Sequence, residues 1–158
     1  MIKEIQWYNI AVRLRDFLKA FKYKNGKRPF DKMTDRENLK IRVGKGNTGE
    51  FPAIWIIFGS EEDAGKQASI TGAVVQLWVD IYVTNQATSA YDANDNNYKQ
   101  MYDVETEFCD LLWKFNKDLQ KRGLGTKLTL QGILSDGDEN ENQNISQHRL
   151  VLDIEWYK

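Results

Sequence analysis

The feature that most constrains the fold of this chain is a long, uninterrupted alternation of apolar and polar residues over residues 72–84. Valine, leucine and isoleucine fill one face of the segment, and Trp78, Asp80 and Tyr82 stand on the other. An alternation with a period of two predicts a β-strand with one buried face and one wet face. The segment would span about 43 Å, which is longer than a usual strand. We therefore expect it to outrun the core of a small domain and to need a partner.

Composition limits the class of protein. A chain of 158 residues with 41% hydrophobic residues is expected to form a single domain, 1–158, with a substantial core. The only cysteine excludes a disulfide within the chain. Neither a signal peptide nor a membrane span is expected, because the N-terminal residues are charged and the apolar runs are short.

Charge is unevenly distributed along the chain. The net charge of −1 argues against a general polyanion binder, but basic residues outnumber acidic residues by 13 to 5 within residues 1–45. The remainder is correspondingly acidic. An electrically polar protomer of this kind suits the stacking of unlike faces.

The rest of the sequence predicts two helices and four further strands. Apolar residues recur at helical spacing in residues 2–23 and from about 96 to 121. The expected strands cover 39–43, 51–58, 126–135 and 148–157.

The order of these elements predicts the fold. The order α-β-β-β-α-β-β favours an α+β fold in which the N-terminal helix and the long central helix pack on one face of a mostly antiparallel sheet. We interpret the glycine-rich segment 44–49 as a hairpin turn. The strands at 51–58 and 72–84 are expected to form a hairpin, and the last two strands another, with an acidic tip at 136–144.

Few residues point to catalysis. A Cys109 thiolate would need His148, the only histidine, within hydrogen-bond reach. Cys109 lies on the apolar edge of the predicted helix, where a small buried side chain is the simpler interpretation. His148 is expected to be solvated or to cap a loop. One cysteine and one histidine also make a zinc site improbable. We predict that the protein is not an enzyme and holds no cofactor or metal.

Two polar stretches resemble the start of a calcium loop. Both have Asp or Asn at every second position, over residues 92–96 and 136–142. Both lack the glycine and the bidentate glutamate that such a loop requires, so solvated turns are expected.

A basic segment over residues 21–30 is a candidate for contact with nucleic acid. Aromatic residues are interleaved there with basic residues. The basic residues form a candidate basic patch: Lys22, Lys24, Lys27 and Arg28. Such a segment can pair with phosphates and stack on bases. The alternative is a helix end and a solvated loop whose aromatic residues anchor it to the core, and the near-neutral net charge favours this alternative.

Two strands carry candidate interface residues on their polar faces: Trp78, Asp80, Tyr82, Asp153, Glu155 and Tyr157. Large aromatic side chains on a wet strand face are enriched at protein interfaces. The alternative is that a helix or a second sheet layer of the same chain covers them.

The chain resembles the tail terminator, or tail completion, proteins of long-tailed bacteriophages and related phage-like particles. The resemblance rests on the opening helix, the strand pair 51–58 and 72–84, the helix 98–121 and the ending 150–158. The run Leu-Trp-Val-Asp-Ile-Tyr-Val in the long strand and the finish apolar-x-apolar-Asp-Ile-x-Trp carry it most clearly.

This resemblance implies a structural role in the virion tail or neck, after assembly in the host cytoplasm. It implies a homo-oligomeric ring, usually a hexamer, that caps the tail tube, ends tail growth and joins the tail to the head connector. Its partners would be the tail tube protein, the connector or stopper protein, and DNA that passes without sequence-specific binding. An acidic loop could face the channel, formed by Asp136, Asp138, Glu139 and Glu141. A stopper or head-completion protein, or less favourably a nucleic-acid module using residues 21–30, remains an alternative.

Overall fold

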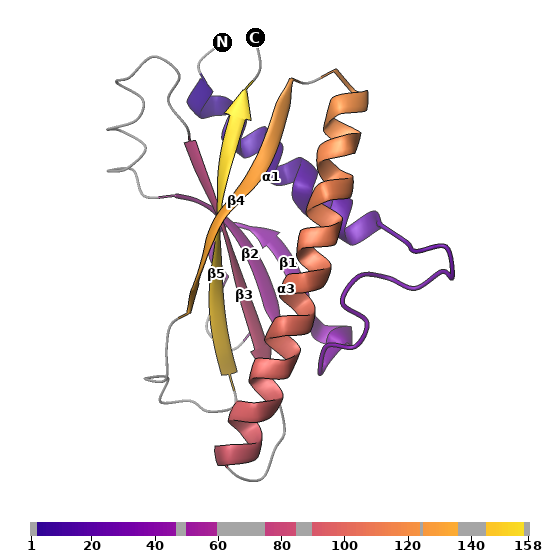
Figure 1. Ribbon diagram of the computed structural model, residues 1–158, viewed down its shortest axis with the longest axis vertical. Helices are drawn as coiled ribbons and strands as arrows, with labels where there is room; N and C mark the ends of the chain where they lie inside the picture. Colours follow the sequence, from indigo (N-terminus) through magenta and orange to yellow (C-terminus); the bar gives the residue numbers. More distant parts are fainter. Residues whose placement is uncertain are drawn as a thin grey trace.

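The computed structural model describes residues 3–46, 50–59, 75–84, 90–123, 125–135 and 145–156. The fold is α+β, with two helices and a five-stranded, mostly antiparallel sheet in the predicted order (Figure 1). A short 3-10 turn (Arg36–Asn38) precedes β1. The helices and strands are α1 (Lys3–Ala20), β1 (Lys40–Val43), β2 (Ala53–Phe58), β3 (Val75–Thr84), α3 (Ala90–Lys121), β4 (Thr126–Ser135) and β5 (Ile145–Trp156).

The strands lie in the order β1-β2-β3-β5-β4, and the pairs β2–β3 and β4–β5 are antiparallel, as predicted. The prediction of a hairpin turn at 44–49 is wrong, because β1 and β2 are parallel. The two described glycines differ: a Cβ added to Gly46 would lie 2.8 Å from Nε1 of Trp55, whereas Gly44 adopts a φ of 94° with open space around it. A glycine in the sequence can indicate either a tight turn or a close contact, so the sequence alone did not distinguish the two.

We expected the strand at 72–84 to need a partner outside the chain. Its described part, β3, is instead paired with other strands of the same chain. β3 lies in the middle of the sheet, paired with β5 over Val75–Thr84 and with β2 over residues 77–82. Residues 72–74 lie outside the described part of the chain. Because β3 has neighbours on both sides, the edges of the described sheet belong to β1 and β4.

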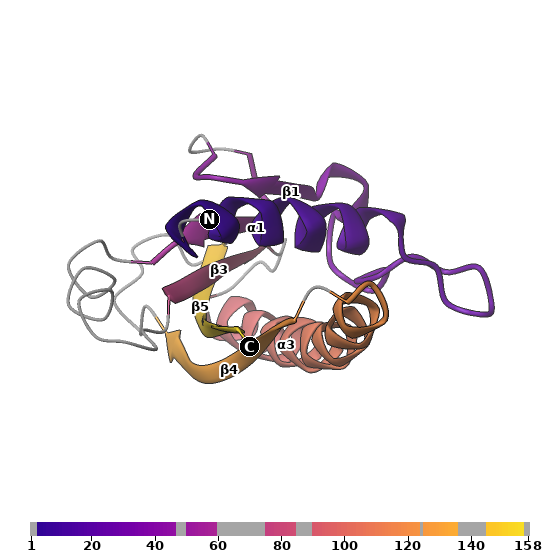
Figure 2. The same cartoon turned by 90° about the horizontal axis from the view of Figure 1, so that it is seen from above.

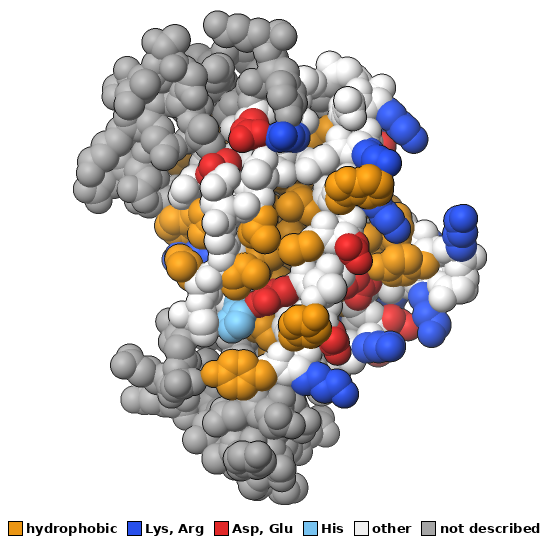
Figure 3. All heavy atoms as spheres, viewed as in Figure 1, with side chains coloured by type: hydrophobic (Ala, Val, Ile, Leu, Met, Phe, Trp, Pro, Cys, Tyr) orange, Lys and Arg blue, Asp and Glu red, His pale blue; other side chains and the backbone are white. Residues whose placement is uncertain are grey.

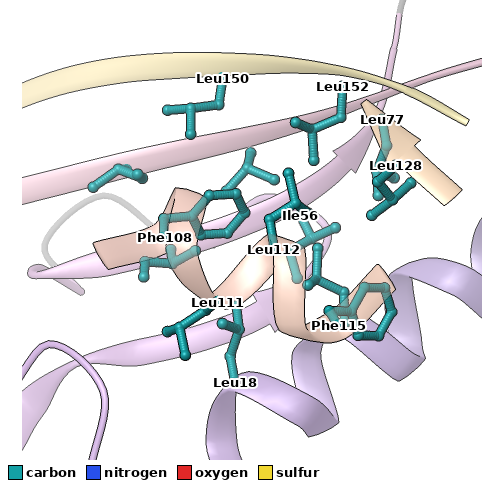
Figure 4. Packing of buried hydrophobic residues seen from close by; sticks show 14 of the residues in the cluster. Leu18, Ile56, Leu77, Phe108, Leu111, Leu112, Phe115, Leu128, Leu150 and Leu152 are labelled. Carbon is teal, nitrogen blue, oxygen red and sulfur yellow. The ribbon is translucent and has the colours of Figure 1, made fainter. Parts of the chain in front are cut away.

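Both helices pack on one face of the sheet, as predicted (Figure 2). α1 lies over the β1 side and α3 over β5 and β4. The core between them joins Leu18 of α1 to Phe108 and Phe115 of α3 (Figure 4). These side chains meet alternate residues of the strands, including Ile56 and Leu150. The period-two pattern of the strands and the helical spacing of the apolar residues therefore converge on one core.

The predicted boundaries of the two helices need correction. α1 ends at Ala20, and Phe21 and Tyr23 beyond it pack against the core instead of continuing the helix. The turn that follows brings Gly26 to a φ of 82°. α3 begins at Ala90, earlier than expected, and its Asn97 is buried. Small polar residues are weak helix formers, so the sequence predicts a loop where the structure has the first turns of α3.

The connection between α1 and β1 is fastened to α3 by one carboxylate. Oε2 of Glu107 accepts hydrogen bonds from the Tyr23 hydroxyl at 2.6 Å and from the backbone N–H of Phe30 at 2.9 Å. A second fastening joins three segments: Oε1 of Gln100 accepts from the backbone N–H of Thr34, and its Nε2 donates to the carbonyl oxygen of Thr84. A segment predicted to be irregular is therefore tied to the first half of α3.

We expect Glu107→Ala to loosen this connection. The substitution removes two hydrogen bonds to a charged acceptor, and each such bond contributes about 1.5–3 kcal/mol. Trypsin should cut after Lys24 and Lys27 at least about tenfold faster in the variant, because local opening becomes less costly. Asp110→Ala, at an exposed position on the same helix, is the control and should leave the cleavage rate unchanged. Equal rates for both variants would contradict the assigned role of Glu107.

Candidate interaction surface

The sheet face opposite the two helices, called the second face from here on, carries the residues that alternate with the core positions. The described helices both pack on the other face. Strand register places neighbouring side chains of β2, β3 and β5 in rows across the second face. Its members are Trp55, Ile57, Gln76, Trp78, Asp80, Tyr82, Arg149, Val151, Asp153 and Glu155.

An ion pair lies at the centre of the second face. Nε of Arg149 donates to Oδ1 of Asp80 at 2.7 Å, and the second nitrogen donates to Oδ2 at 3.0 Å. Asp80 is only 1% exposed, whereas Arg149 keeps partial contact with solvent. The guanidinium carbon of Arg149 lies 4.2 Å from the centroid of the Trp78 ring. The two-point geometry fixes the guanidinium plane, so Arg149 holds Trp78 in a defined position.

Three aromatic rings cluster beside this ion pair. The centroids of Tyr82 and Trp55 are 4.5 Å apart, and those of Tyr82 and Phe51 are 4.8 Å apart. Trp55 is buried, and its Nε1 has no hydrogen-bond partner among the described residues. Tyr82 remains partly exposed. The cluster is next to Asp80, because Trp55 and Arg149 both lie opposite Asp80 in the strand register.

One end of the second face is acidic. Asp153 and Glu155 lie on the same face of β5, two residues apart. Burial, and then the charge of Glu155, raise the pKa of Asp153, while a hydrogen bond from Gln76 opposes the rise. Glu155 pairs with Lys127 of β4 at 3.5 Å. This end of the surface therefore combines a carboxylate pair with a nearby cation.

The predicted interface residues fall into three groups. Trp78 and Tyr82 lie partly exposed on the second face, as do Asp153 and Glu155. Asp80 shares this face, but its carboxylate is buried against Arg149 and presents no surface. Tyr157 lies outside the described residues. Sequence reasoning missed Arg149 and Trp55: the register that places both beside Asp80 is not readable from one strand at a time.

The aromatic residues of the basic segment serve the fold. Phe30 is buried, and Tyr23 is bound to Glu107, which together with burial raises the pKa of its hydroxyl. Lys114 lies over the ring of Phe21 at 5.0 Å. These contacts favour the anchored-loop interpretation and leave little aromatic surface for stacking on bases.

The four cations of the basic patch differ in their exposure and in their ion pairs. Lys22, Lys24 and Lys27 are exposed, and Arg28 pairs with Asp31 and Glu37. Figure 3 shows Lys and Arg side chains along the flank that carries the α1–β1 connection, with Asp and Glu side chains between several of them. The patch thus belongs to a flank that carries both signs of charge.

His148 is not the solvated residue that the sequence predicted. It faces the helices from β5, and its Nδ1 is hydrogen-bonded to Oε1 of Glu105 on α3. Glu105 precedes Cys109 by one helical turn. Burial, followed by the charges of Glu105 and Asp110, raises the pKa of the Cys109 thiol. A raised thiol pKa is opposite to what a nucleophilic cysteine requires.

We expect Cys109 to react slowly with iodoacetamide. Because its pKa is raised, the thiolate fraction at pH 8 is smaller than that of an unperturbed cysteine, and partial burial limits access. The rate should be about tenfold below that of a cysteine in an unfolded peptide and should rise steeply toward higher pH. Mass spectrometry of timed aliquots measures it. In denaturant the difference should vanish; a native rate equal to the denatured rate would contradict this environment.

The structure describes only one of the two stretches that resemble a calcium loop. Asp92, Asn94 and Asn96 lie within α3, so the expected solvated turn is wrong there. The stretch 136–142 and the acidic loop candidates Asp136, Asp138, Glu139 and Glu141 lie outside the described residues. Within the described part of the chain, no three His, Cys, Asp or Glu side chains gather as a metal site.

The chain matches no protein-family model and no curated protein sequence. Among the described residues, no helix is long and apolar enough to cross a membrane.

Proposed function

We propose that this protein is a structural assembly component that forms a ring on the end of a phage-type tail tube, ends tube growth and joins the tail to the head connector. The observation that supports this most is the second face, where Arg149 holds a partly exposed Trp78 on the same face as Tyr82. Tryptophan, tyrosine and arginine are the residues most enriched at the energetic centres of protein interfaces. The proposed partners are further copies of the chain, the tube protein and the connector or stopper protein.

The arrangement of charge supports contact between unlike surfaces. The exposed lysines of the basic patch lie on the α1–β1 connection, whereas the acidic end of the second face lies on β5. Head-to-tail contacts between unlike surfaces close into rings when the rotation permits. A stopper protein would have the same partners and remains the second candidate within this class.

A tube-growth assay tests this proposal. Tube protein from the same particle is polymerised with and without the purified chain, and tube lengths are measured by negative-stain electron microscopy. We expect shorter tubes with an added ring of density at one end. Trp113→Ala, on the opposite side of the molecule, should act like the wild type, whereas Trp78→Ala should not. Tubes of unchanged length without end density would contradict a terminator role.

A further inference from the structure

At the β4 edge of the sheet, one side chain binds the backbone of the edge strand. Nδ2 of Asn116 on α3 donates to the carbonyl oxygen of Leu128 on β4 at 2.8 Å. Oδ1 of the same carboxamide accepts the backbone N–H of Leu128, also at 2.8 Å. One amide side chain thus binds both backbone groups of one residue in an edge strand.

The direction of these groups follows from the sheet. β4 pairs with β5 on its inner side, with Leu128 opposite Ile154. In an antiparallel pair, residues alternate between exchanging two hydrogen bonds with their neighbour and directing both groups away from it. Leu128 directs its N–H and C=O outward, where the next strand of a larger sheet would bind. Asn116 makes the two bonds that such a strand would make.

The position of this contact matters for association. Asn116 and Leu128 line a cleft of about 780 Å³ between α3 and β4, together with Leu112, Trp113 and Leu130. An edge strand beside an apolar cleft is a template for pairing with another chain. Without the carboxamide, Leu128 would have an unbound donor and acceptor beside apolar surface, and both would gain from a new strand.

The other half of β4 is protected by a different feature. A bulge between Leu130 and Gly132 interrupts the register, and bulges discourage edge pairing. Beyond it, Ile133 and Leu134 are 42% and 58% exposed. The regular half of the strand, which is the better template, contains Leu128, the residue that Asn116 binds.

We propose that Asn116 is an edge guard: its carboxamide prevents β4 from pairing with the edge strand of a second copy of this chain. A carboxamide suits the task because it is both donor and acceptor, whereas leucine of similar size is neither. The inference does not rest on the proposed function, because it concerns association beyond whatever assembly the wild-type protein forms.

The test compares Asn116→Leu with Gln120→Leu. Gln120 lies one turn later on α3 and lines the same cleft, so its replacement makes the same chemical change without touching the edge. Amide hydrogen exchange reports on Leu128, and light scattering across a concentration series reports the mass. In Asn116→Leu, we expect the Leu128 amide to exchange at least about tenfold faster in dilute solution. Its mass at high concentration should exceed the wild-type mass at least about twofold. Gln120→Leu should show neither effect.

Two results would overturn the proposal. One is a variant whose Leu128 amide exchanges faster while its mass equals that of the wild type at every concentration. The other is equal association of Phe108→Ala, compared under conditions that match its stability to that of Asn116→Leu, since general unfolding would then explain the effect. If Asn116→Leu fails to fold, Asn116→Ala provides the same comparison with a smaller side chain.

Discussion

Asp80→Ala is expected to lower the free energy of unfolding by about 3–5 kcal/mol, the usual cost of removing one partner of a buried ion pair. Asp80 is almost wholly buried and binds Arg149 at two points. Its removal leaves the guanidinium next to Trp78 with two donors that lose their acceptor. Urea denaturation followed by circular dichroism measures the change.

A paired variant separates the ion pair from simple loss of packing. Asp80→Asn with Arg149→Met removes both charges and keeps the approximate volume, so most of the lost stability should return. If the double variant were as unstable as Asp80→Ala, the penalty would not come from an unpaired charge. A loss below about 1 kcal/mol in the single variant would show that the pair behaves like an exposed one.

Phe108→Ala is expected to cost about 3–5 kcal/mol, because a large buried ring is replaced by a cavity. Phe108 is fully buried on α3 and lies in the core that α3 forms with the sheet (Figure 4). Thermal unfolding should show a drop in Tm of about 6–20 °C, since each kcal/mol shifts Tm by roughly 2–4 °C in a chain of this size.

Trp113→Ala is the matched control for this variant. Trp113 lies on the same helix, is 59% exposed and contacts Lys117 through its ring. We expect its replacement to change the free energy of unfolding by about 0.5–1 kcal/mol at most. Similar losses in both variants would contradict the orientation of α3 on the sheet.

The parts of the fold that depend on local periodicity were predictable. The stripe that includes Phe108 and Phe115 predicted α3, and the alternation around Trp78 predicted β3 and its two faces. Helix boundaries were less predictable because they depend on distant contacts. Tyr23 leaves α1 to bind Glu107, which follows it by more than eighty positions.

The candidate surface was only partly predictable for the same reason. Trp78 and Tyr82 stand out in the sequence as aromatic residues on a polar strand face. Arg149 does not stand out, because its role depends on the strand register, which places it opposite Asp80. The parallel pairing of β1 and β2 was also hidden, since a glycine-rich segment is equally compatible with a hairpin.

The central claim, that this chain assembles into a ring, is tested most directly by its native mass. Multi-angle light scattering is measured across a concentration series, alone and with an equimolar amount of tube protein. With a protomer of 18.4 kDa, a closed ring of six copies has a mass of about 110 kDa. We expect that species, reached at the latest when tube protein is present. A mass that stays at the protomer value under both conditions and at every concentration would contradict the account.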